Sequence, residues 1–96
     1  MQNRGQLTER VQHKAKEFFG YEIDIIEFRL LPYIQYIMVN DHKIDPNKIN
    51  SSEREIIRKW ERADYCEIVG IRDLVVTKEF WEFMNEILWL AYVDIY

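Results

Sequence analysis

The stretch VVTKEFWEFMNEILWLAYVDIY, residues 75–96, decides the fold, because it predicts a terminal helix with more apolar surface than one neighbour can cover. Thr77 can cap the start of this helix, and Glu79 lies in its first turn, where the helix dipole favours an acid. We expect the helix to end near Val93. Its apolar side chains cover roughly 200° of the helical wheel, whereas an ordinary surface helix needs a stripe of about 100°.

Trp89, Val93 and Tyr96 lie outside that apolar arc, on the side of the helix where a solvated surface is expected. The first half of the helix carries Glu82 and Glu86 on the same side. Two interpretations stay open: the other helices of a small fold cover this side, or it meets a second chain. We take these three residues as the candidate interface of a homodimer.

The N-terminal part of the chain predicts one clear helix. Val11 and Ala15 recur at helical spacing, Thr8 can cap the helix start, and Gly20 is a natural stop. Residues 1–6 are polar, and we expect them to be flexible.

Residues 21–40 carry conflicting signals. The segment YEIDI, residues 21–25, alternates apolar and acidic residues, which predicts a strand. The apolar residues that follow recur at helical spacing, although a proline is unfavourable inside both a central strand and a helix. We favour a short extended piece near 21–25, followed by a helix with a kink or break at Leu31-Pro32.

The C-terminal half of the sequence predicts a helix, a hairpin and a second helix, in that order. Ser52 and Glu55 fit a capping box at the start of a helix over 52–63, and the runs YCEIV and IRDLVV around Gly70 predict a β-hairpin. A lone hairpin is marginally stable, so it must lie against the helices. The predicted fold class is therefore α+β and mostly helical, one domain over residues 1–96 in which helices pack with a small β-hairpin.

Composition narrows the class of protein further. The 96 residues are 48% hydrophobic and 15% aromatic, which suits one modest core. Cys66 is the only cysteine, so no disulfide can form within the chain, as fits a reducing compartment. The N-terminus lacks the apolar segment of a signal peptide, and no apolar run is long enough for a membrane span. We expect a cytoplasmic protein with no membrane partner.

The residues that can carry chemistry do not form a convincing catalytic pattern. His13 lies one helical turn from Glu9 and Glu17, but this group faces away from the predicted apolar stripe. Cys66 and His42 could in principle act as nucleophile and base, yet nothing in their spacing supports it. The connector DHKIDPN holds one histidine and two acids, which is too few for a metal site. We expect no enzyme activity, no cofactor and no metal.

Four arginines raise nucleic-acid binding as an alternative. Arg54, Arg58 and Arg62 follow one another at four-residue spacing on the predicted helix, and Arg72 lies in the hairpin. A helix with arginines followed by a hairpin is the order of a winged-helix module, in which the helix enters the major groove. Two glutamates flank this stripe and the net charge is -4, so DNA binding is possible but not favoured.

The segments EREIIRKWERADY, from residue 53, and LVVTKEFWEFMNEILWLAYVDIY, from residue 74, resemble small uncharacterised proteins of phages and prophages of Gram-positive bacteria. LLPYIQYIMVNDHKIDPNKIN, residues 30–50, adds to this resemblance, which covers about residues 27–95. It implies a cytoplasmic, non-catalytic accessory protein that acts on a host or phage protein. Our leading interpretation is such an interaction protein, self-associating through its terminal helix; the alternative is a winged-helix DNA-binding regulator.

Overall fold

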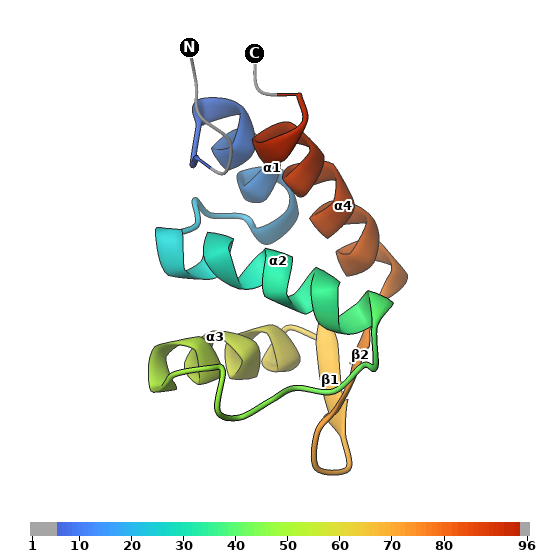
Figure 1. The fold of residues 1–96 in the computed structure, drawn as a ribbon. Coiled ribbons are helices and arrows are strands. Elements are labelled where there is room, and N and C mark those ends of the chain that lie inside the picture. The colour runs from blue at the N-terminus through green and yellow to red at the C-terminus, as the bar shows by residue number, and fades with distance from the viewer. Residues whose placement is uncertain (1–5, 95–96) are drawn as a thin grey trace.

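The computed structural model describes residues 6–94 and confirms a mostly helical α+β fold (Figure 1). Its elements, in chain order, are α1 (Glu9–Phe19), α2 (Ile25–Val39), α3 (Ser51–Arg62), β1 (Cys66–Val69), β2 (Asp73–Val76) and α4 (Lys78–Tyr92). The second half therefore has the predicted helix–hairpin–helix order. Residues 1–6 were expected to be flexible, and all of them except Gln6 lie outside the described part of the chain.

Helix α1 begins and ends where its capping residues predict. The hydroxyl of Thr8 accepts a hydrogen bond from the backbone N–H of Val11, and Gly20 ends the helix with a φ of 87°. The side-chain amide of Gln12 then pairs with both backbone groups of Ile23, accepting from its N–H at 2.9 Å and donating to its carbonyl at 2.7 Å. The segment expected to be extended thus binds a side chain, and no strand forms in it.

Helix α2 runs without interruption through Pro32, so a break at Leu31-Pro32 is wrong, whereas the kink given as the other possibility stays a prediction. Pro32 has no N–H to donate to the carbonyl of Phe28, four residues earlier. A capping box formed by Asp24 and Glu27 fixes the helix start. Buried side chains on both sides of the proline outweigh the lost hydrogen bond; they are Phe28, Leu30, Leu31, Ile34 and Ile37.

Helix α3 begins at Ser51, one residue before the predicted start. Its N-cap is Asn50, whose side chain accepts from the N–H of Glu53, and Glu53 in turn accepts from the N–H of Asn50, both at 2.9 Å. The capping box predicted for Ser52 and Glu55 does not form.

The hairpin is joined by a third, very short extended segment. Strands β1 and β2 pair antiparallel around Gly70, with Ile68 opposite Leu74. On the other edge of β2, the N–H of Leu74 donates to the carbonyl of His42 at 2.7 Å, and the N–H of Ile44 donates to the carbonyl of Arg72 at 2.9 Å. The connection between α2 and α3 is therefore bonded to the hairpin.

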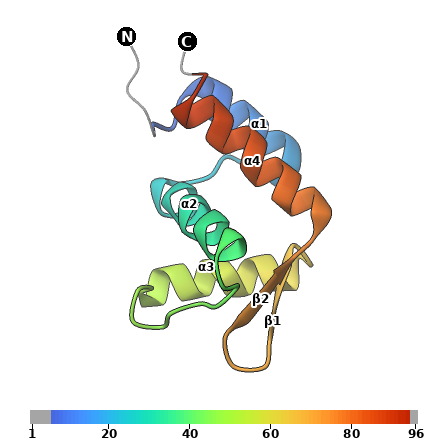
Figure 2. The same ribbon diagram turned by 45° about the vertical axis from the view of Figure 1, so that its right-hand side comes forward.

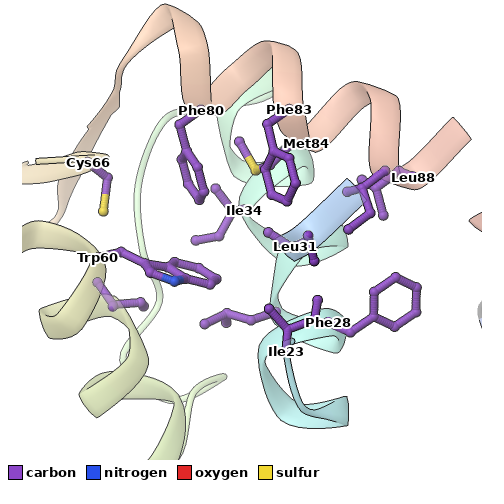
Figure 3. Close-up of a cluster of buried hydrophobic side chains, with 14 of the residues drawn as sticks. Ile23, Phe28, Leu31, Ile34, Trp60, Cys66, Phe80, Phe83, Met84 and Leu88 are labelled. Carbon is purple, nitrogen blue, oxygen red and sulfur yellow. The ribbon is translucent and has the colours of Figure 1, made fainter. Parts of the chain in front are cut away.

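Helix α2 lies at the centre of the molecule. Helices α1 and α4 lie on one side of it, with α4 in contact with α2, and α3 and the hairpin lie on the other (Figures 1 and 2). The wide apolar arc of α4 is explained by its two neighbours, because α4 contacts both α1 and α2. Figure 3 shows the resulting core, in which Phe80 of α4 and Ile34 of α2 lie close to the indole of Trp60 of α3.

Candidate interaction surfaces

The end of α4 carries apolar side chains that residues 6–94 leave exposed. Trp89 and Val93 are each 56% exposed, whereas Leu88 and Ala91 of the same helix are buried. Tyr96, the third predicted interface residue, lies outside the described residues. A groove of about 420 Å³ runs beside Trp89; its walls are Pro32, Gln35, Asn85, Leu88, Trp89, Tyr92 and Val93.

Helix α2 supplies the second wall of this groove. Gln35 Nε2 donates to Asn85 Oδ1 at 2.8 Å, and the rings of Phe28 and Tyr92 stack with centroids 6.4 Å apart. Ile25, Tyr36 and Val39 lie seven, four and seven residues from Pro32 along α2, so they project from the same side of the helix. All three are exposed. We call the surface made of Ile25, Pro32, Tyr36, Val39, Trp89 and Val93 the helix face.

The α2 half of the helix face was missed from the sequence. The signal was present in the sequence, because α2 is apolar on nearly every side. Its neighbours in a small fold cannot cover all of these sides. The ambiguity between strand and helix over this segment concealed it, since the side on which a residue projects depends on that choice.

A second groove, of about 510 Å³, lies between α3, the hairpin and the connection that follows α2. Six of its residues are apolar: Ile44, Pro46, Ile49, Ile57, Ile68 and Ile71. The other four are Arg54, Arg58, Glu61 and Arg72. We call this the arginine groove. Three of the four arginines predicted as nucleic-acid contacts thus come together, whereas Arg62, also exposed, does not line the groove.

Local contacts fix the rim of the arginine groove. Arg54 Nη2 donates to the carbonyl of Pro46 at 3.0 Å, which ties the first turn of α3 to the connection. Arg58 Nη1 lies 2.7 Å from an oxygen of Glu55 in an exposed pair. Glu61 accepts from the N–H of Ile68 at 3.4 Å, on the free edge of β1. Glu61, the only acidic residue in the described lining, therefore makes a structural hydrogen bond.

The apolar floor of the arginine groove was not foreseen. Ile44 and Ile49 belong to a segment predicted only as a turn-rich connector. Ile71 follows Gly70 at the hairpin tip and is 92% exposed. A large apolar residue beside a turn glycine is an unusual choice for a solvated loop, and this was the available signal.

His13 and Cys66, both considered for catalysis, lie in opposite surroundings. His13 Nε2 lies 3.4 Å from Glu17 Oε2, with both side chains exposed to solvent. Burial, with a smaller contribution from the charge of Glu61, raises the pKa of the Cys66 thiol to about 12, so it carries almost no thiolate near neutral pH. Within residues 6–94, no three histidine, cysteine or acidic side chains gather as they would around a metal ion.

One cluster of polar side chains joins α2, α3 and the connection between α1 and α2. Glu27 is 5% exposed, and its carboxylate accepts hydrogen bonds from the Tyr21 hydroxyl at 3.0 Å and from Lys59 Nζ at 3.2 Å. Burial raises the pKa of Tyr21, against the effect of Lys59. Burial acts to lower the pKa of Lys59, but the hydrogen bonds and charges of Tyr21 and Glu27 outweigh it and raise that pKa. Each of the three side chains has a partner within the cluster, so we interpret the cluster as structural.

Comparisons with protein-family models, with curated proteins and with solved structures found no match to this chain. Among the described residues, no helix has both the length and the apolar character that crossing a bilayer requires.

Proposed function

We propose that this protein is a small non-catalytic interaction module that forms a homodimer through the helix face. The observation that carries the proposal is the half-exposed indole of Trp89, which stands with Val93 beside the open groove of α2. Contiguous exposed apolar surface on a small domain marks an interaction site.

The chemistry of the groove favours a second copy over a charged partner. None of the seven side chains lining it is acidic or basic. Two identical chains of net charge -4 repel each other at long range, and an uncharged contact adds no buried like charges. A two-fold axis would place the same patch on both subunits, so the Trp89 side chains could cover each other or the facing grooves. Burial of one half-exposed indole contributes on the order of 3 kcal/mol.

A phage-type accessory role and a cytoplasmic location belong to the same proposal. The first is supported by the resemblance of residues 27–95 to small phage and prophage proteins. The second is supported by the single cysteine, Cys66. Such a dimer would present its remaining surfaces to a host or phage protein.

Sedimentation equilibrium or light scattering over a wide concentration range tests the homodimer. We expect a concentration-dependent dimer that Trp89→Glu and Val93→Glu both abolish. Val75→Glu is the matched control, because Val75 is 52% exposed on the outer side of the hairpin, away from the helix face. Circular dichroism must show that each of these variants is folded. A wild-type chain that stays monomeric at millimolar concentration contradicts the proposal.

DNA binding through Arg54, Arg58, Arg62 and Arg72 is the second candidate function. The observation in its favour is that all four side chains are exposed and three share one groove. Helix α3, however, follows α2 after residues 40–50, a longer connection than the three- or four-residue turn of a helix-turn-helix. Retention on duplex DNA with a steep salt dependence, weakened by Arg58→Ala, would support it; no retention at low salt would remove it.

A further inference from the structure

The arginine groove combines two properties that the helix face does not. Its floor is apolar, with five isoleucines among the ten lining residues, and its rim carries three guanidinium groups. Its volume, about 510 Å³, is within the range of pockets that hold small ligands or anchoring side chains. The elements that form it, α3, the hairpin and the connection after α2, lie on the opposite side of α2 from α4 (Figure 1), so its role does not depend on the proposed homodimer.

The local charge of the groove is opposite to that of the chain. Three arginines face one glutamate in the lining, although the whole chain has a net charge of -4. Glu61 is held by the N–H of Ile68, and Arg54 by the carbonyl of Pro46. Arg58 pairs with Glu55, and both side chains are more than 60% exposed, so water and salt weaken this pair and another carboxylate can replace it. The groove is thus positive at its rim and preformed at its base.

The hairpin tip adds an uncovered apolar contact. Ile71 lines the groove yet is 92% exposed, and the preceding glycine, Gly70, takes a φ of 68° to make the turn. Arg72 follows directly, and its carbonyl accepts the N–H of Ile44, which anchors the tip to the groove floor. An apolar group lying in the groove would cover Ile71 while an acid next to it reached Arg72.

We propose that the arginine groove binds an acidic peptide that inserts a large apolar side chain between α3 and the hairpin. Carboxylates next to that side chain would pair with Arg58 and Arg72, which present the planar donor pattern that suits carboxylate. Nucleic acid suits the groove less well. Among the described residues, no aromatic side chain lines it to stack on a base, and an apolar floor offers nothing to a phosphate backbone.

Fluorescence anisotropy with a labelled peptide of alternating glutamate and leucine tests this proposal at low ionic strength. We expect saturable binding that weakens about tenfold in Arg58→Ala and in Arg72→Ala. Ile71→Ser should also weaken it, and this change removes a side chain that contributes little to the folded core. Arg62→Ala is the matched control, since Arg62 lies on the same helix outside the groove, and it should leave the affinity unchanged. Peptides with glutamine for glutamate, or alanine for leucine, should bind at least about tenfold more weakly.

Other outcomes overturn the proposal. It fails if the peptide does not bind at millimolar protein, or if Arg62→Ala weakens binding as much as Arg58→Ala, which would indicate only diffuse attraction to α3. It also fails if duplex DNA binds more tightly than the peptide and loses affinity in Arg58→Ala, Arg62→Ala and Arg72→Ala alike. Thermal unfolding must show that each variant stays folded. Because Ile71 and Arg72 are exposed, we expect their substitution to leave the fold intact, so that a loss of binding can be measured.

Discussion

Glu27 Oε2 of α2 lies 3.2 Å from Lys59 Nζ of α3, and Lys59 in turn lies 4.3 Å from the centre of the Tyr21 ring. The carboxylate is almost completely buried, while 43% of the lysine side chain reaches solvent. The pair therefore joins two helices at the edge of the core, where the ammonium keeps part of its hydration.

Removal of the buried carboxylate should destabilise the protein. Glu27→Ala takes away the partner of Tyr21 and Lys59 and half of the capping box of α2. We expect the free energy of unfolding to fall by about 2–4 kcal/mol, measured by urea denaturation. The matched control is Glu55→Ala, which breaks the exposed pair with Arg58 and should cost less than about 1 kcal/mol. Equal losses in the two variants would show that the burial of Glu27 is not what matters.

The start of α3 can be tested by two neighbouring substitutions. Asn50→Ala removes the side chain that caps the helix, and we expect it to cost about 1 kcal/mol of stability. Ser52→Ala should be close to neutral, because the Ser52 side chain is exposed within the first turn and does not cap. The two free energies of unfolding, measured under the same conditions, decide between the two caps, and the reverse order would place the cap at Ser52.

Trp60 contains an unusual buried polar atom. Its Nε1 has no hydrogen-bond partner among the described residues, although the side chain is completely buried between Phe19 and Phe80. An unpaired buried donor costs roughly 1–3 kcal/mol. Trp60→Phe removes that donor along with some packing, so we expect a net loss below about 1.5 kcal/mol.

Trp60→Ala should cost about 3–5 kcal/mol, because it leaves a large cavity. Denaturant midpoints of the two variants separate the contributions of the donor and of the ring. A Trp60→Phe variant as unstable as Trp60→Ala would show that the N–H has a favourable partner after all.

The thiol of Cys66 should make the protein sensitive to alkali. Its pKa is raised from 9.0 to about 12 in the folded state, so between these pH values the unfolded chain loses a proton that the folded chain keeps. The free energy of unfolding must then fall as pH rises through this window, by roughly 4 kcal/mol at most. Cys66→Ala should reduce the slope between pH 9 and 10, before the raised pKa values of Tyr21 and Lys59 contribute in the same direction. An unchanged slope would contradict this account.

Local signals were sufficient for the helix ends that carry one clear capping residue. Thr8, Gly20 and Thr77 stand where the sequence places them, since a cap depends on neighbours within one turn. The start of α3 was predicted at the wrong cap because two overlapping capping boxes are possible, Asn50 with Glu53 and Ser52 with Glu55. Local sequence does not distinguish them.

Features that depend on residues distant in sequence could not be predicted. The helix through Pro32 persists because α3 and α4 bury its side chains, which outweighs the preference of the proline itself. The pairing of His42 and Ile44 with β2 connects segments about thirty residues apart. The arginine groove depends on that pairing, so its arginines were predicted as a stripe but its apolar floor was not.

The contact between the two ends of the described chain determines when α1 can become stable. Arg10 Nη2 lies 2.8 Å from Asp94 Oδ2, and α1 packs mainly against α4. During synthesis α1 leaves the ribosome long before α4, so its apolar stripe of Val11, Ala15 and Phe18 must wait for almost the whole chain. Helix α1 should therefore complete its packing only once α4 is available.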